Sequence, residues 1–338
     1  MTERTAPLSM VALIGGERFE HVWTPEFIAA LEQRGTFAIG DHTGLWTEEA
    51  TAAEVRRHEV AIVGWDTRGL PAGLASDPGR LRHICCYSGT VRLFVPRELV
   101  EAGLVVTNWG DLPAGPVAEA AMTHLLAALH QIPTATRVLG SGGWGLEVSL
   151  NGSLDGLAVG VYGMGVIGSR FVDMIRPFGP RLMAFDPYVE QLPDSVARAE
   201  SLEELCEWSE ALVIHAGLSD ETNGSVTADH LARLPDHGIV VNTARGAIID
   251  QEALFAEVSS GRLRAGLDVL EPDWLDADHP VRRAEHLSIT FHQLDQLHWP
   301  QRPGLTPMQR RTLEHVDRHV AGAAPRFAFD LDRYDRSS

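Results

Sequence analysis

The chain has few cysteines, fewer positive than negative charges, and no long apolar run. Its three cysteines in 338 residues provide neither a disulfide framework nor the paired spacing of a zinc site. The 28 Lys and Arg residues face 46 Asp and Glu residues, a formal net charge of -18, whereas a nucleic-acid surface requires a basic stripe. The apolar segment Met10–Ile14 is too short for a membrane span or a signal-peptide core. We therefore expect a cytoplasmic protein without metal, nucleic-acid or membrane partners.

The C-terminal half has the alternating pattern of an α/β protein, and the length suffices for two domains. From residue 157 on, short apolar runs alternate with helical segments, for which Ser201, Thr227 and Asp250 are good N-caps. This alternation predicts a doubly wound, mostly parallel sheet. Its predicted strands are Leu157–Tyr162, Leu182–Phe185, Ala211–His215, Ile239–Asn242, Ala265–Asp268 and Leu287–Phe291.

The N-terminal part repeats this rhythm less regularly and predicts a second, smaller α/β domain. A helical stretch, Val117–Gln131, ends before Pro133 and is expected to carry the chain across to the larger domain. The tail after about Pro325 is rich in Asp and Arg and is expected to be partly disordered, while the segment before it packs back on the first domain. The predicted strands are Met10–Ile14, Val60–Val63, Arg82–Cys86 and Leu104–Thr107, and the predicted helices are Pro25–Arg34 and Pro96–Ala102.

A glycine motif lies in the middle of the chain. Gly163, Gly165 and Gly168 follow an apolar run, as in a strand that turns tightly into a helix. The first glycine permits the turn, the second lets a pyrophosphate approach the backbone, and the third lets the helix pack on the strand. Asp186 follows at the end of the next predicted strand, where a carboxylate binds a ribose 2′-hydroxyl and repels the extra phosphate of NADP. The motif predicts a dinucleotide site that favours NAD.

Ligands of an open α/β sheet collect at the carboxyl ends of its strands. Arg245 presents a planar fork that suits a carboxylate. A carboxylate beside an imidazole stabilises the charged ring, so that it can protonate a carbonyl or deprotonate an alcohol. Three later predicted strands end in residues suited to such work: Thr243, Ala244 and Arg245 after the first, Asp268 and Glu271 after the second, and His292 after the third.

These residues resemble the motifs of the NAD-dependent D-isomer-specific 2-hydroxyacid dehydrogenases. The resemblance covers roughly residues 81–300 and rests on Val117–Glu119, Gly163–Gly168, Asp186-Pro187, His215–Thr222, Asn242–Gly246 with Asp250, and Gly266–Val269. In that family the nucleotide domain is inserted into the substrate domain. The resemblance thus implies a Rossmann-type domain over residues 114–295, inserted into a smaller flavodoxin-like α/β substrate domain formed by residues 1–113 and 296–338.

The resemblance also implies a role for each site residue. Arg245 is expected to clamp the substrate, His292 to be the acid/base and Glu271 to be its partner. The backbone amides of a glycine-containing loop are expected to bind the substrate carboxylate: Ser88, Gly89 and Thr90. The remaining residues are expected to contact the cofactor, Val166 and Ile167 under the pyrophosphate, Asp268 at the nicotinamide carboxamide, and Thr243 and Ala244 nearby.

Several departures from the family pattern face the substrate. Asp268 and Glu271 are closer together than is usual, so either the loop is shortened or Asp273 partners His292; the Glu-Pro pair favours Glu271. Phe291 replaces the usual proline before the histidine, Gln293 follows it, and the substrate loop lacks its common acidic residue. These changes make the identity of the substrate harder to predict than the type of reaction.

We expect an oxidoreductase that transfers a hydride between NAD(H) and C2 of a small 2-oxo or 2-hydroxy acid, with D-isomer specificity. One alternative is a dehydrogenase of a small anion, as in the phosphite and formate branches of the family. Another is a non-catalytic NAD(H)-sensing protein on the same fold, because fold alone does not decide function. The apolar circumference of Val117–Gln131 suits a subunit interface, so a homodimer is expected.

Overall fold

The structure is a computed structural model, and it describes residues 7–15, 19–40, 46–65, 67–144, 152–290, 292 and 304–336. The chain divides into two compact units. Unit 1 consists of Met1–Leu112 and Trp299–Ser338, and unit 2 of Pro113–His298. The expected return to the first domain at residue 296, together with Phe291 and Gln293, lies outside the described residues.

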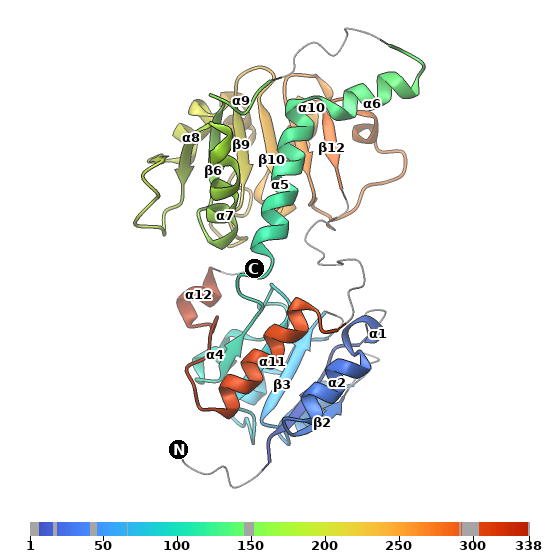
Figure 1. Cartoon of the computed structure of the whole chain (residues 1–338), viewed down its shortest axis with the longest axis vertical. Coiled ribbons are helices and arrows are strands. Elements are labelled where there is room, and N and C mark those ends of the chain that lie inside the picture. Colours follow the sequence, from blue (N-terminus) through green and yellow to red (C-terminus); the bar gives the residue numbers. More distant parts are fainter. Residues whose placement is uncertain are drawn as a thin grey trace. The chain divides into compact units, whose positions relative to one another are not determined.

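Unit 2 is built on a parallel sheet in the strand order β12-β11-β10-β9-β6-β7-β8 (Figure 1). The order reverses between β6 and β9, which is where ligands bind in a doubly wound sheet. This confirms the expected Rossmann-type fold class. Its strands are β6 Ala158–Tyr162, β7 Arg181–Phe185, β8 Val196–Arg198, β9 Ala211–Ile214, β10 Ile239–Asn242, β11 Arg264–Leu267 and β12 Leu287–Ile289.

Helices cover both faces of this sheet, as βαβ crossovers require. One face packs on α5 and α7, with Leu125 and Phe171 fully buried beneath them, and the other packs on α8, α9 and α10. The side chains of Ser201 and Asp250 cap α8 and α10 as expected. The helices are α5 Ala114–Leu129, α6 Ile132–Gly140, α7 Val166–Ile175, α8 Leu202–Trp208, α9 Ala228–Arg233 and α10 Gln251–Ser259, with short 3₁₀ turns at Arg176–Phe178, Gly246–Ile248 and Pro280–Arg283.

The long helix at the start of unit 2 differs from the expectation at both ends. It begins at Ala114, with Pro116 inside its first turn, where a missing N–H costs nothing. It ends at Leu129, and Gln131 then has a left-handed φ of 51°. Pro133 lies in the first turn of α6, so this proline starts the next helix as well as ending the run before it.

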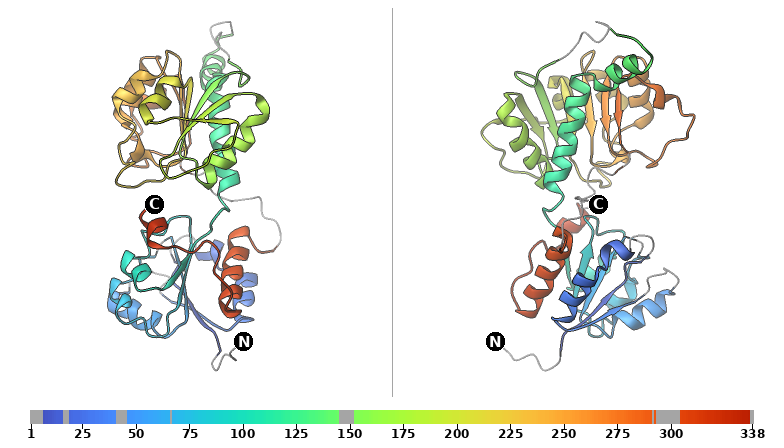
Figure 2. Two further views of the ribbon diagram at one scale, coloured as in Figure 1. Left: turned by 90° about the vertical axis from the view of Figure 1, so that its left-hand side faces the viewer. Right: turned by 45° about the vertical axis from the view of Figure 1, so that its right-hand side comes forward.

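Unit 1 has a parallel sheet in the flavodoxin-like order β2-β1-β3-β4-β5. Helices α1, α2 and α11 cover one face, and α3, α4 and α12 the other (Figure 2). Its strands are β1 Ser9–Ala12, β2 Thr36–Ile39, β3 Val60–Gly64, β4 His83–Tyr87 and β5 Val105–Thr107. Its helices are α1 Phe19–Val22, α2 Pro25–Glu32, α3 Glu48–Val55, α4 Arg97–Glu101, α11 Pro307–Val320 and α12 Leu331–Asp335, with a 3₁₀ turn at Ala72–Ala75.

The C-terminal tail is ordered from residue 326 to 336, so the expectation of partial disorder is wrong there. Ala328 forms an antiparallel bridge with Thr107, and the side chains of Phe329 and Tyr334 enter the core of unit 1. The Tyr334 hydroxyl donates a hydrogen bond to the Val95 carbonyl oxygen at 2.7 Å. The two aromatic side chains supply the buried area that the charged residues around them lack.

None of the helices in the described part of the chain is long and apolar enough to cross a bilayer. All three cysteines are buried free thiols, in agreement with the absence of a disulfide framework in the sequence.

Candidate functional site

The glycine motif forms the turn between β6 and α7. Gly163 has a φ of 96°, which side chains rarely adopt, and a Cβ there would collide with the backbone of Ala216. A Cβ at Gly168 would collide with the Gly163 carbonyl oxygen, so this glycine lets α7 pack on the turn. Gly165 is the N-cap of α7, and a Cβ there would meet no described atom within 4 Å. The open space faces a helix N-terminus, which is suited to a pyrophosphate.

The residues after Gly165 are consistent with that use. Val166 is 59% exposed although it is apolar, as expected for a residue over which a ligand lies. Ile167, in the first turn of α7, is half-buried beside it.

Asp186 joins the end of β7 to the glycine turn. Its Oδ2 accepts a hydrogen bond from the Met164 N–H at 2.7 Å, and its Oδ1 accepts one from the Tyr188 N–H at 2.9 Å. A carboxylate has about four acceptor positions, so these bonds leave room for a ribose hydroxyl. The side chain therefore lies beside the turn of the glycine motif, where a dinucleotide's ribose is expected.

Arg245 is held in a tight turn after β10. Asn242, which is buried, accepts a hydrogen bond from the Ala244 N–H at 3.0 Å and donates one to the Arg245 carbonyl oxygen at 2.8 Å. In the same turn, Thr243 Oγ1 is buried and finds no hydrogen-bond partner among the described residues. A buried hydroxyl without a partner is costly, so this orphaned atom fits a ligand group bound at the strand end. Together with the glycine turn and Asp186, it makes the residues present fit NAD.

Gly246 brings the loop after β11 against the Arg245 turn. A Cβ at this position would collide with the Leu270 carbonyl group, so only glycine allows the two backbones to approach. On the neighbouring strands, the buried Asp268 accepts the His292 N–H through its carbonyl oxygen at 2.7 Å. The structure thus places the strand-end segments that carry Arg245, Asp268 and His292 on the adjacent strands β10, β11 and β12.

The partner of the His292 ring in the structure is Asp273. His292 Nδ1 contacts Asp273 Oδ2, and Asp273 Oδ1 accepts the Leu270 N–H at 2.9 Å. The bond from the Leu270 N–H closes the loop between Leu270 and Asp273, and so it directs the Asp273 carboxylate back towards the end of β11. His292 itself has a φ of 53°, a left-handed backbone that a bulky residue adopts only when its surroundings impose it.

Glu271, the expected partner, is fixed through its backbone. Gln251 Oε1 accepts the Glu271 N–H at 2.8 Å, and Gln251 Nε2 donates to the Glu271 carbonyl oxygen at 2.9 Å. Glu271 as a whole is exposed. The geometry therefore favours the alternative raised by the short spacing, with Asp273 as the carboxylate beside the imidazole.

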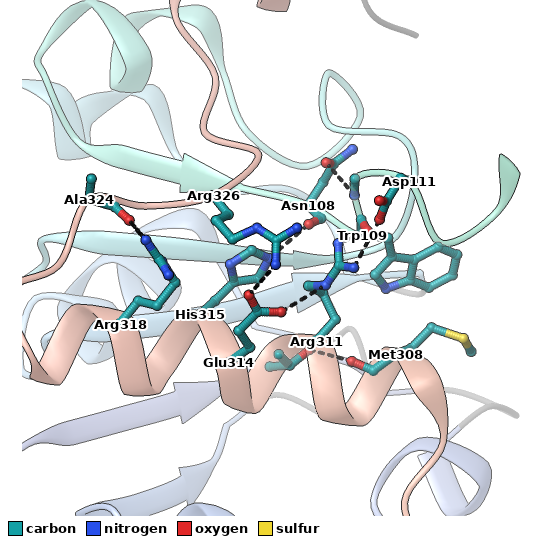
Figure 3. Close-up of polar contacts among 12 residues, drawn as sticks. Asn108, Trp109, Asp111, Met308, Arg311, Glu314, His315, Arg318, Ala324 and Arg326 are labelled. Atoms are coloured by element: carbon teal, nitrogen blue, oxygen red, sulfur yellow. Dashed lines mark hydrogen bonds and ion pairs between the residues drawn. The ribbon is translucent and has the colours of Figure 1, made fainter. Parts of the chain in front are cut away.

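The loop Ser88–Thr90 lies in unit 1 after β4. Ser88 Oγ accepts the Thr90 N–H at 2.9 Å, and Asn108 Nδ2 donates to the Gly89 carbonyl oxygen at 2.8 Å. The Asn108 backbone is held in turn by α11, because its carbonyl oxygen contacts His315 Nε2 at 2.9 Å (Figure 3). The loop that sequence reasoning selected is thus rigidly supported, although the Asn108 contact has no local sequence signature.

Two buried histidines have pKa values far below that of a free imidazole, so we expect them to make the fold sensitive to acid. His215, at the end of β9, packs on the Phe171 ring with centroids 5.0 Å apart, and neither ring nitrogen has a partner among the described residues. Burial lowers the pKa of His215 to about 3. In unit 1, burial and the neighbouring His319 and His315 likewise lower the pKa of His83 to about 3.

We expect the His215→Leu variant to be less acid-sensitive than the wild type. Below pH 6.5 the unfolded chain binds a proton at this residue and the folded chain does not, so the wild type loses about 1.4 kcal/mol per pH unit at this residue between pH 6 and 3. Full stability is present above pH 6.5. Urea unfolding between pH 8 and 4.5 measures it, and an unchanged pH slope in the variant would contradict the assignment.

Comparison with known proteins finds one matching family model and several relatives named as dehydrogenases or reductases. The sequence model of the D-isomer specific 2-hydroxyacid dehydrogenase NAD binding domain matches residues 122–293. The chain is 32% identical over 270 residues to a D-3-phosphoglycerate dehydrogenase of Methanocaldococcus jannaschii, which covers 79% of this chain and 51% of the relative. The chain thus spans about half the length of that relative.

Two further comparisons cover more of the other protein. A glyoxylate reductase of Korarchaeum cryptofilum is 27% identical over 282 residues, which are 79% of this chain and 85% of the relative. The crystal structure of D-mandelate dehydrogenase from Rhodotorula graminis aligns with a TM-score of 0.79 at 20% identity, over 96% of this chain and 98% of that one. The latter likeness supports the fold.

Proposed function

The chain belongs to the D-isomer-specific 2-hydroxyacid dehydrogenase family, whose NAD-binding domain it contains, and we propose that it transfers a hydride between NAD(H) and C2 of a small 2-oxo or 2-hydroxy acid. The observation that carries the proposal is the His292–Asp273 pair at the strand ends beside Asp268. It supplies an acid/base where the nicotinamide end of a bound dinucleotide is expected.

We propose that Asp273 orients the His292 ring and determines which of its nitrogens faces the substrate. Its carboxylate accepts the Nδ1 proton, so the other ring nitrogen, Nε2, exchanges a proton with the substrate. In the reduction, the charged ring donates this proton to the carbonyl oxygen and takes another from solvent after the product leaves. When bound, NADH supplies the hydride that arrives at C2. The negative charge on Asp273 stabilises the charged ring without a large rearrangement.

Arg245 is proposed to hold the substrate's carboxylate with its planar guanidinium, which suits two parallel hydrogen bonds. The Asn242 bonds on either side of it fix the backbone turn, and Arg245 Nη1 donates to the Ala244 carbonyl oxygen at 2.7 Å. In unit 1, the Ser88–Thr90 loop is proposed to bind the substrate through the backbone amides of Ser88 and Gly89, since the Thr90 N–H already donates to Ser88 Oγ. Dinucleotide binding is assigned to Gly163, Gly165, Val166, Ile167, Gly168, Asp186, Thr243, Ala244 and Asp268.

A panel of substrates with NADH tests the proposal. We expect absorbance at 340 nm to fall with at least one of glyoxylate, pyruvate, hydroxypyruvate or a branched 2-oxo acid, and less with NADPH because Asp186 repels its phosphate. Turnover of phosphite or formate with NAD instead would point to the small-anion branch. Tight NADH binding without turnover of any member would favour the NAD(H)-sensing alternative.

The homodimer and the cytoplasmic location stay predictions. In support of the first, Ile132 and Leu139 on α6 are 53% and 55% exposed, as a surface between copies requires. Sedimentation equilibrium decides between one chain and two.

A further inference from the structure

A histidine of α5 is buried next to the proposed cofactor site and is not used by the reaction described above. His124 is 1% exposed and faces β12, where Ser288 Oγ lies 3.0 Å from its Nδ1 and Thr290 Oγ1 lies 3.1 Å from its Nε2. Ser288 lies in β12 and Thr290 directly follows the strand, two positions further on, so both side chains lie on the face that α5 covers.

The position of His124 depends on a glycine in the neighbouring strand. A Cβ at Gly266 in β11 would lie 2.5 Å from the Cβ of His124, so another residue there would push α5 away from the sheet. Glycine at this position lets the imidazole reach the strand end.

The contact continues from Thr290 to Asp268. Thr290 Oγ1 donates a hydrogen bond to Asp268 Oδ1, and Asp268 as a residue is 3% exposed. A carboxylate can only accept, so this bond uses the single hydroxyl proton of Thr290. Thr290 can therefore only accept from His124, whose Nε2 must carry the proton.

The proton inventory then fixes the whole chain of bonds in one direction. Burial lowers the pKa of His124 against the opposing effect of Asp268, so the ring is neutral and has one N–H. With that proton on Nε2, Nδ1 accepts from the Ser288 hydroxyl. The bonds run from Ser288 to His124, from His124 to Thr290, and from Thr290 to Asp268.

We propose that His124 is a positioning residue for the cofactor: through Thr290 it orients the Asp268 carboxylate that binds the nicotinamide carboxamide. This inference rests on the proposed role of Asp268. Without the His124 N–H, no imidazole donates to the Thr290 oxygen. The Thr290 hydroxyl can then rotate, and donation to Asp268 is only one of the orientations that it can adopt.

Binding of two ligands by one set of variants tests the inference. We expect His124→Leu to raise the Kd for NADH about tenfold, the loss of one hydrogen bond to a charged group, while the Kd for ADP-ribose changes less than about twofold. ADP-ribose lacks the nicotinamide, so a loss confined to NADH locates the effect at the carboxamide. His124→Gln keeps an N–H near the Nε2 position and is expected to restore NADH binding to within about threefold.

The controls separate positioning from a structural role. His130→Leu makes the same change at an exposed residue just after α5, and no change in either Kd is expected. ¹⁵N NMR of wild-type His124 at pH 7 is expected to show the proton on Nε2. If His124→Leu fails to fold, Thr290→Val breaks the same connection and is expected to weaken NADH alone.

Equal losses for NADH and ADP-ribose, failure of His124→Gln to restore binding, or no loss at all would overturn the inference. Absence of NADH binding by the wild type would overturn both this inference and the proposed cofactor use. The selective loss of NADH binding in a protein that turns over no 2-oxo acid would leave the inference in place and refute the proposed reaction.

Discussion

Replacing His292 with alanine is expected to lower kcat for the best 2-oxo acid by about a thousandfold, the typical contribution of a positioned acid/base. Without the imidazole, we expect the carbonyl oxygen to take its proton from water, which is a far weaker acid than a charged imidazole. The Kd for NADH is expected to stay within about twofold, because the dinucleotide is assigned to the turns after β6, β7, β10 and β11.

The comparison variant for this experiment is His130→Ala. It removes an exposed histidine of the same unit and is expected to retain full activity. Unchanged turnover in His292→Ala would remove this residue from the mechanism. A loss of NADH binding as large as the loss in kcat would instead assign His292 to the cofactor site.

Asp273→Asn is expected to lower kcat by about a hundredfold, whereas Glu271→Gln is expected to stay within about threefold of the wild type. The amide preserves the size of Asp273 but has one oxygen and one nitrogen. If its oxygen keeps the Leu270 N–H, its NH₂ faces Nδ1 and forces the ring into the tautomer with the proton on Nε2. That tautomer cannot accept a proton from an alcohol, so oxidation suffers more than reduction.

The matched pair separates the two candidate carboxylates. Each variant removes one negative charge from the same loop, so a general effect of charge on substrate binding appears equally in both. A large loss in Glu271→Gln with a small one in Asp273→Asn would restore the partner expected from the Glu-Pro pair. In that case the loop takes another arrangement when the substrate is bound.

The periodic parts of the fold could be predicted from the sequence, and the exceptions are short or half-exposed. Strands such as Ile239–Asn242 are buried on both faces and read as continuous apolar runs. Strand β2, Thr36–Ile39, has no fully buried residue, and β8, Val196–Arg198, buries only its first. Neither produces a pattern that differs from a loop.

The site residues could be predicted from the sequence where the local backbone or the position in the sheet admits only one kind of residue. Gly163 and Gly168 are glycines because a Cβ does not fit, and Arg245 lies at a strand end. The partner of His292 depended on which of two carboxylates a loop turns inward, and the bond from Asp273 to the Leu270 N–H decides that in the structure. His124 could not be selected from the sequence, because its partners Ser288 and Thr290 are more than 160 residues away.

The fate of deuterium from NADH shows whether this protein transfers a hydride to C2 of a 2-oxo acid. The enzyme is incubated with NADH carrying deuterium at C4 of the nicotinamide, in each of its two stereochemical forms, and with the best 2-oxo acid of the panel. We expect one form to deliver deuterium to C2 of the product and this product to be the D-isomer. If neither labelled form of NADH delivers deuterium to C2 of the 2-hydroxy acid, or if the product is the L-isomer, D-specific hydride transfer by this site is contradicted.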